Sequence, residues 1–270
     1  MPRAIWSGSI SFGLVSVPVR MFSAVEEHKL QFHYVHEPDG SRIGYEKICK
    51  AEEKPVPDEE IVKAYEYEKG EYVYLADEDF EAAQVEGGRT IDIQAFVPQD
   101  EIDPIFFEQT YYLAPAEDGE KVYALLARAM EDSGLSAVAK FVMRDRQYLA
   151  CLRIRESVIT LERMHFADEI RDAGELAPKR GRVDKKELAM AAQLVEQFSG
   201  KFEPESFRDT YRDTLQKIIE AKRKGEEVHV PEKPKAEAPT DLMEALRASV
   251  EGAKKERKSA KGRKRRARAA

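Results

Sequence analysis

A chain of 270 residues is long enough for one large domain or two small ones with a real hydrophobic core. Its 2 cysteines exclude a disulfide framework and are typical of a reducing cytosol. The start, MPRAIWSGSISFG, lacks the apolar run of a signal peptide, and the chain has no stretch of about eighteen apolar residues that could span a membrane. We therefore expect a cytoplasmic protein that does not enter a membrane.

The charge is divided unevenly along the chain. The net charge is −7, but residues 252–270 hold ten basic side chains and one acidic side chain, a net charge of +9, so the rest of the chain has −16. Dense blocks of like charge are typical of arms that contact nucleic acid or another anionic surface, or else of solvated tails. The ten basic residues, which we expect to contact DNA, are Lys254, Lys255, Arg257, Lys258, Lys261, Arg263, Lys264, Arg265, Arg266 and Arg268.

The first segment has the alternation of a β-strand. In SISFGLVSVPVRMF (9–22), the apolar residues Ile10, Phe12 and Leu14 alternate with small or polar residues. Pro18 predicts that the segment after it is an edge strand or a bend, because proline cannot donate a hydrogen bond to a strand ladder.

Three more strands are expected in the first 115 residues, namely EYVYLA (71–76), TIDIQAFV (90–97) and FFEQTYYLAP (106–115). DEDFEAAQ (77–84) has the pattern of a single helical turn. One face of the second of these strands should consist of Ile91, Ile93, Ala95 and Val97. Short strands at this spacing, separated by turn signals, indicate a barrel or a sandwich.

A helix and three further strands follow. KVYALLARAM (121–130) has apolar residues at helical spacing, and Gly134 should end the helix. The apolar side of this helix should consist of Val122, Leu125, Leu126, Ala129 and Met130. Residues 137–166 then contain three strand-like runs with a polar turn near Asp145, a pattern that predicts a meander projecting from the barrel.

After RDAGELAPKRGR the apolar period changes to that of helices. Asp184 and Glu187 form the expected capping box of a helix that ends at Gly200. A second helix should start near Pro204, in its favoured first-turn position, and end at Gly225. The expected stripes are Leu188, Ala191, Ala192, Val195 and Phe198 in the first helix and Phe207, Tyr211, Leu215, Ile218 and Lys222 in the second.

No sequence motif of a catalytic site is present. The chain has no G-x-x-x-x-G-K-[ST], no G-x-G-x-x-G and no G-x-S-x-G. Cys151 lies in a strand pattern, where a small core residue is the expected role. His33, His36 and Cys49 are close in sequence, but a closed zinc site needs four ligands. We expect no catalytic residue, no metal and no cofactor, and hence a protein that is not an enzyme.

Basic residues gather in the strands of the meander. With a period of two, two strand faces should be basic: Lys140, Arg144 and Arg146 on the first strand, and Arg153 and Arg155 on the next. Clustered cations can follow a phosphate backbone without reading the bases. The alternative is an ordinary solvated strand face, with Asp145 and Glu156 as ionic partners.

Near the end of the chain, a linker precedes a short amphipathic segment. Residues 226–239, EEVHVPEKPKAEAP, have the composition of a flexible linker. DLMEALRASV (241–250) has Asp241 and Glu244 as a capping pair, and its apolar residues are Leu242, Met243, Leu246 and Val250. Its isolation between a linker and a tail favours docking into a groove of a partner protein, the alternative being a surface helix that returns to the body.

Four blocks of the sequence closely resemble the bacterial Ku proteins, which bind the ends of DNA double-strand breaks. The blocks are RAIWSGSISFGLVSVPVRMFSA (3–24), IGYEKIC (43–49), EIDPIFFEQTYYL (101–113) and KFEPESFRDTYRDTLQ (201–216). Their spacing is also similar, so the resemblance covers nearly all of residues 1–250. Many relatives have C-x-x-C where this chain reads Cys49-Lys50-Ala51-Glu52, which argues against a family metal site here.

The resemblance implies a β-rich α+β fold with a Ku-type β-barrel core, a strand bridge or dimerisation arm and a C-terminal helical arm, which forms a ring around duplex DNA as a homodimer. The implied domains are a barrel core with bridge arm (1–183), a helical arm (184–225), a flexible linker (226–239), a ligase-recruiting segment (240–251) and a basic disordered tail (252–270).

The implied activity is sequence-independent binding of double-stranded DNA ends, with recruitment of the ATP-dependent DNA ligase D in non-homologous end joining at breaks in the nucleoid. An acidic outer surface with a basic bore would explain the charge of −16 outside the tail. The residues expected to line the bore are Arg20, Arg42, Lys47, Lys140, Arg144, Arg146, Arg153 and Arg155. The alternative is an architectural, nucleoid-type DNA-binding protein that acts mainly through its basic tail.

Overall fold

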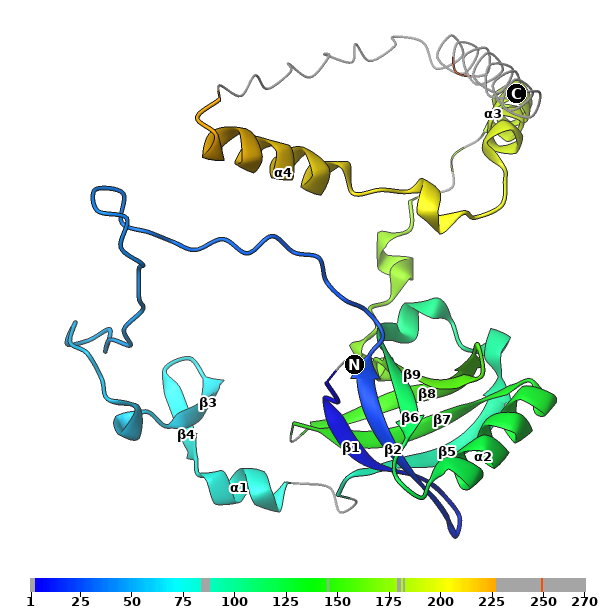
Figure 1. Ribbon diagram of the computed structural model, residues 1–270, viewed down its shortest axis with the longest axis horizontal. Helices are drawn as coiled ribbons and strands as arrows, with labels where there is room; N and C mark the ends of the chain where they lie inside the picture. The colour runs from blue at the N-terminus through cyan, green and yellow to red at the C-terminus, as the bar shows by residue number, and fades with distance from the viewer. Residues whose placement is uncertain are drawn as a thin grey trace. The chain divides into compact units, whose positions relative to one another are not determined.

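The computed structural model describes residues 3–83, 88–144, 146–178, 181, 183–226 and 249. It divides into two compact units, residues 1–175 and residues 176–270, which we describe separately (Figure 1). The division falls a few residues before position 183, where we expected the core to end.

The first unit contains a closed barrel of seven strands, which confirms the β-rich α+β fold class (Figure 1). Around the barrel the strand order is β1-β2-β6-β9-β8-β7-β5. Only the β1–β5 pair is parallel, and it closes the barrel. The strands are β1 (Trp6–Phe12), β2 (Val15–Ser23), β5 (Thr90–Pro98), β6 (Phe107–Pro115), β7 (Leu135–Met143), β8 (Arg146–Arg155) and β9 (Val158–Met164).

The β1–β2 hairpin corrects two expectations. Leu14 does not extend the strand but lies fully exposed in the hairpin turn, beside Gly13 with a φ of 59°. As a whole, β2 is not an edge strand, because a closed barrel has no edges and β2 pairs with β6 as well as with β1. The pairing of β2 with β6 begins only at Val19. Pro18 lies just outside this ladder, so its missing N–H costs no hydrogen bond between β2 and β6.

Strand β5 follows the expected alternation only in its first half. Ile91 is buried and Ile93 is partly buried against the core, but Ala95 is exposed. The β5–β7 register shifts between Ile93 and Ala95, so Gln94 is an extra residue, as in a β-bulge. An extra residue exchanges the two faces of the strand, which is why the expected single face was wrong beyond Ile93.

Helix α2 (Glu120–Ser133) ends at Gly134, which has the left-handed φ of 67° that favours glycine. Its buried side consists of Tyr123, Leu126, Ala127 and Met130, whereas Leu125 is 70% exposed and Ala129 is also exposed. The expected apolar side was therefore rotated. The cause is the Tyr123 hydroxyl, which donates to the Leu113 carbonyl (2.6 Å) and accepts from the Ile159 amide (2.8 Å) inside the barrel.

Strands β7, β8 and β9 are three neighbouring strands of the barrel wall, so the expected projecting meander was wrong. Their alternate residues, such as Ala139, Phe141 and Leu152, are buried in the core. Alternation is the same for a wall strand as for a projecting ribbon, and only the pairing of β7 with β5 and of β9 with β6 distinguishes them.

A segment outside the barrel connects β2 to β5. It contains a two-stranded sheet of β3 (Lys63–Glu68) and β4 (Glu71–Leu75), followed by the short helix α1 (Asp77–Ala82). No residue of these three elements is buried, and Tyr65, Tyr67, Tyr72 and Tyr74 are all exposed. A two-stranded hairpin of this kind is marginally stable by itself.

In the second unit, the described residues include helices α3 (Lys185–Phe198) and α4 (Thr210–Arg223). The Asp184 carboxylate accepts from the amides of Lys186 (2.7 Å) and Glu187 (3.4 Å), which confirms the expected start of α3. The expected start of α4 was wrong: Pro204 begins a 3-10 turn that ends in extended backbone at Phe207, and Asp209 then caps α4.

Short 3-10 turns complete the described chain, namely Asp58–Glu60, Gln99–Glu101, Pro104–Phe106, Ala167–Glu169, Ala173–Leu176 and Pro204–Ser206. Among the described helices, none is both long and apolar enough to cross a membrane. The basic tail and Leu242, Met243, Leu246 and Val250 of the amphipathic segment lie outside the described residues.

Candidate nucleic-acid interface

Cross-strand register brings Arg20 and Arg155 into one row on the outer face of the barrel. Arg20 of β2 pairs with Ala114 of β6, and Arg155 of β8 pairs with Val158 of β9. The β6–β9 ladder ends at the Leu113–Ile159 pair, so Ala114 and Val158 lie beside each other one position further on. The two arginines are thus three strand spacings apart, roughly 14 Å between backbones.

A second row of residues crosses the same outer face, two positions further along β2 than Arg20. Its first two members, on β2 and β6, are aromatic. Phe22 pairs with Tyr112, Tyr112 pairs with Thr160, and Thr160 pairs with Arg153. Phe22 and Tyr112 are both half-buried. Between and beside the two rows lies a groove of about 810 Å³, lined by Ala4, Arg20, Phe22, Ser23, Tyr112, Ala114, Pro115, Arg155, Glu156 and Val158. A volume of this size is typical of ligand sites.

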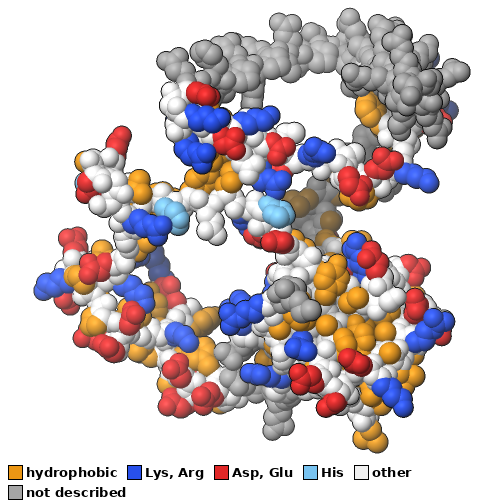
Figure 2. Space-filling model, in the orientation of Figure 1, with side chains coloured by type: hydrophobic (Ala, Val, Ile, Leu, Met, Phe, Trp, Pro, Cys, Tyr) orange, Lys and Arg blue, Asp and Glu red, His pale blue; other side chains and the backbone are white. Residues whose placement is uncertain are grey.

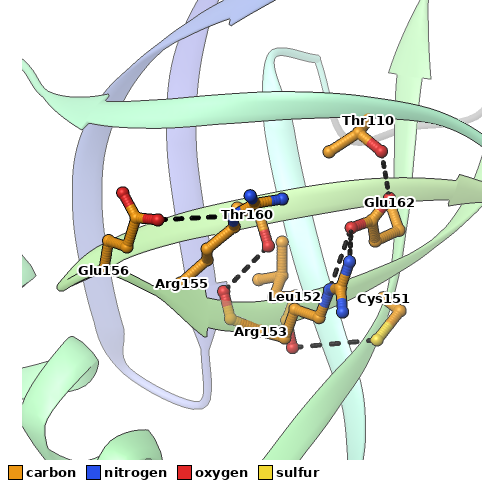
Figure 3. A network of polar contacts seen from close by, with 8 residues as sticks. All are labelled: Thr110, Cys151, Leu152, Arg153, Arg155, Glu156, Thr160 and Glu162. Carbon is orange, nitrogen blue, oxygen red and sulfur yellow. Dashed lines mark hydrogen bonds and ion pairs between the residues drawn. The ribbon is translucent and has the colours of Figure 1, made fainter. Parts of the chain in front are cut away.

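The two arginines of the groove are available to an anion. Among the described residues, no carboxylate lies within 4.0 Å of the Arg20 guanidinium. Of the carboxylates in the described part of the chain, only that of the exposed Glu156 approaches Arg155, at a loose 3.9 Å (Figure 3). Exposed pairs of this kind contribute little energy, so Arg155 could exchange its partner for a phosphate at low cost.

Arg153 is committed to a buried partner instead. Its Nε donates to Glu162 Oε1 at 2.9 Å and its Nη2 donates to the same oxygen, while the Thr110 hydroxyl donates to Glu162 Oε2 (Figure 3). The Glu162 side chain is only 4% exposed. Thr160 also donates its hydroxyl to the Arg153 carbonyl at 3.1 Å. With its guanidinium held by Glu162, Arg153 is less available to a phosphate than Arg155.

The turn between β7 and β8 separates three cations that we expected on one face. β7 ends at Met143, Arg144 has a left-handed φ of 52°, and Arg146 starts β8. Lys140 pairs with Leu149 on the outer face, whereas Arg146 pairs with Met143, whose side chain is buried. The single-face expectation was wrong because the chain reverses direction between Arg144 and Arg146. All three cations are exposed.

Arg42 and Lys47 lie in the segment outside the barrel. Arg42 is exposed and its backbone bridges to Val35. The Lys47 ammonium donates to Asp58 Oδ1 at 2.7 Å, and both side chains are exposed. The structure therefore leaves Arg42 open to solvent and gives Lys47 a weak surface partner.

The His and Cys residues that we considered show no metal centre in the described part of the chain, where no group of three or more His, Cys, Asp or Glu is arranged to hold an ion. His36 Nδ1 lies 3.0 Å from Asp39 Oδ1 on the surface. The Cys151 thiol is fully buried, and this burial raises its pKa above the ordinary value. A raised pKa keeps the thiol protonated and unreactive.

Sequence reasoning singled out the exposed cations of the barrel, whose contact with DNA stays a prediction, but it did not predict the groove. Phe22, Tyr112 and Pro115 were missed as outer-face residues. The available signal was an aromatic residue two positions after Arg20, on the face opposite the buried Met21. Figure 2 shows hydrophobic side chains exposed between acidic and basic ones on the face in view.

The barrel and the residues that follow it match one known family of proteins. The family described as "Ku: Ku70/Ku80 beta-barrel domain" matches residues 11–190. The chain belongs to the Ku family.

Relatives named "Non-homologous end joining protein Ku" are similar over almost the whole chain. The protein of Symbiobacterium thermophilum is 45% identical over 94% of this chain and 64% of its own length. That of Desulfitobacterium hafniense is 44% identical over 92% of this chain and 87% of its own, and that of Bacillus subtilis is 39% identical over 92% and 82%. This chain thus spans just under two thirds of the Symbiobacterium protein but most of the other two.

Proposed function

We propose that this protein binds the ends of double-stranded DNA in non-homologous end joining, without a catalytic step of its own. Membership of the Ku family and the names of the relatives support this function. The observation that best supports it is the set of exposed cations on the barrel, Arg20, Lys140, Arg144, Arg146 and Arg155. Arginine and lysine contacts to phosphate hold DNA of any sequence, which an end-binding protein requires.

We further propose that two copies form a ring through which the DNA passes. Two sets of exposed side chains support an assembly of this kind, those of the helices α3 and α4 and those of the β3–β4 hairpin. No residue of α3 or α4 is buried, and Leu188, Val195 and Phe198 on α3 are 60%, 69% and 73% exposed. Helices of this length owe their stability mainly to packing of an apolar face, so a second copy is the proposed cover for α3, for α4 and for the tyrosines of β3 and β4.

A ring can load only at a free end, so the topology of the DNA tests the proposal. In an electrophoretic assay we expect binding to a linear duplex and almost none to a covalently closed circle of the same sequence. Cutting the circle once should restore binding. Equal affinity for circle and linear DNA would contradict the ring.

We also propose that residues 241–250 recruit the ATP-dependent DNA ligase D. The support is the amphipathic sequence between a linker and a basic tail. Replacing both Leu242 and Leu246 with alanine should abolish the stimulation of ligation of linear DNA while leaving end binding unchanged, because the apolar anchors are removed and no cation is. The matched control is Arg247→Ala, which keeps the apolar residues. Loss of both ligation and DNA binding would contradict a separate recruiting segment.

A second function, architectural DNA binding through the tail, is favoured by one observation, the net charge of +9 in residues 252–270. A tail of this kind would bind closed circles as well as linear DNA. The topological experiment above therefore distinguishes the two functions.

A further inference from the structure

We propose that the groove between Arg20 and Arg155 holds unpaired nucleotides of a DNA end, with phosphates on the two arginines and a base on the apolar floor. This inference rests on the proposed end-binding function and assigns the groove a ligand distinct from the duplex: the single-stranded overhang that many breaks have.

The groove is hollow because its central positions hold small side chains. Ala114 and Val158 lie between the two long arginines of their row. Phe22 and Tyr112 form one wall, and Pro115 also lines the groove. The floor and this wall are thus largely apolar, while the cations lie at the two ends of the row. An apolar and aromatic surface next to guanidinium groups is what single-stranded nucleic acid prefers, because every base has a face that can stack and every nucleotide has a phosphate.

Duplex DNA cannot use the floor of this groove. In a duplex the faces of the bases are stacked on one another, and only phosphates, sugars and base edges reach a protein. A duplex passing over the groove would therefore contact Arg20 and Arg155 but leave Phe22, Tyr112 and Val158 without a partner. An unpaired nucleotide can contact both kinds of residue at once.

An acidic peptide is disfavoured by the closure of the barrel. Extended peptides commonly bind by adding a strand to a free sheet edge. The strands that form the groove, β2, β6, β9 and β8, are each paired on both sides. A peptide would thus gain no main-chain ladder here, whereas a nucleotide does not need one.

Of the three described arginines on this face, two are free to bind a phosphate and one is neutralised by a neighbouring carboxylate. Arg153, which lies in the aromatic row, is neutralised by the buried Glu162. Arg20 has no carboxylate within 4.0 Å among the described residues, and Arg155 has only the exposed Glu156 at 3.9 Å. Two cations at opposite ends of an apolar floor match a short run of nucleotides, in which charge repeats along the chain and bases lie between.

The experiment compares a blunt duplex with the same duplex bearing a short 3′ oligo-dT overhang, using the full chain and fluorescence anisotropy. We expect the overhang to bind more tightly. The double variant Phe22→Ala/Tyr112→Ala should lose about 5- to 30-fold in affinity for the overhang, while its affinity for the blunt duplex stays unchanged. Tyr112→Phe should keep the preference because the ring remains. Phe96→Ala, an exposed aromatic residue on β5 that does not line the groove, is the matched control.

A second ligand keeps the test independent of variant folding. An overhang of the same length without bases keeps the phosphates, so the wild-type protein should bind it less tightly than the dT overhang by a similar factor. Equal affinity for the two overhangs, or an overhang preference that survives in the double variant, would overturn the inference. So would an equal loss of blunt and overhang binding in that variant. If the wild type bound blunt and overhang ends equally, this inference alone would fail, whereas failure to bind either end would refute the proposed function itself.

Discussion

Replacement of Arg153 with alanine should lower the free energy of unfolding by about 1–3 kcal/mol, the cost of leaving a buried acceptor without its main partner when that partner, Arg153, is itself 31% exposed. The reason is Glu162, whose side chain is 4% exposed and whose Oε1 accepts from two nitrogens of Arg153. Without Arg153 the carboxylate would stay buried with one hydroxyl donor, that of Thr110. The measurement is denaturant unfolding followed by circular dichroism, with the slope compared between variants.

Two further variants separate the ion pair from other effects of truncation. Arg155→Ala removes a neighbouring arginine whose partner Glu156 is exposed and 3.9 Å away, so stability should change by less than about 0.5 kcal/mol. The double variant Arg153→Met/Glu162→Leu replaces the pair with apolar groups and should recover most of the loss. A double variant as unstable as Arg153→Ala would show that the loss came from packing and not from the unpaired carboxylate.

The sequence predicted most of the barrel because alternation identifies strands reliably when one face is buried. Seven strands and helix α2 lie where the pattern of apolar residues places them. The errors have local causes that a single sequence does not reveal. Gln94 is a bulge residue, and nothing in TIDIQAFV distinguishes it from a paired one. Tyr123 was not counted on the apolar side, but its side chain is buried and its hydroxyl is paired inside the barrel, so the helix is rotated from the expected side.

The interface was predicted less completely because its geometry depends on pairing between distant strands. Charge patterning singled out Arg155, and the resemblance to Ku proteins implied Arg20, but only the registers of β2 with β6 and of β8 with β9 bring them into one row. Arg153 and Arg155 lie two residues apart on β8, so the sequence pattern places both on the same face of the strand. What distinguishes them is Glu162, which lies opposite Cys151 on the neighbouring strand β9. The buried carboxylate of Glu162 pairs with Arg153 and not with Arg155.

The charge of the interface has a measurable consequence in the salt dependence of DNA binding. Each phosphate contact contributes about 0.9 to the slope of log affinity against log salt. The triple variant Arg20→Gln/Lys140→Gln/Arg155→Gln should therefore make the slope for a blunt duplex shallower by about 2.7 for one contacting protomer and by about 5 if both copies of a ring contact the DNA. With a slope shallower by about 2.7, the variant should lose roughly 40-fold less affinity than the wild type when the salt is raised from about 50 to about 200 mM.

The change in the salt slope also tests where the DNA is held, because the wild type and the triple variant have the same basic tail. Titrations at several salt concentrations give the slope, and Arg128→Gln on α2, whose guanidinium is paired with Asp132 at 3.0 Å, is the control that should leave it unchanged. A change near 5 favours two barrels that contact one duplex. An unchanged slope would contradict phosphate contacts by Arg20, Lys140 and Arg155, and would leave those contacts to other cations such as the ten of residues 252–270.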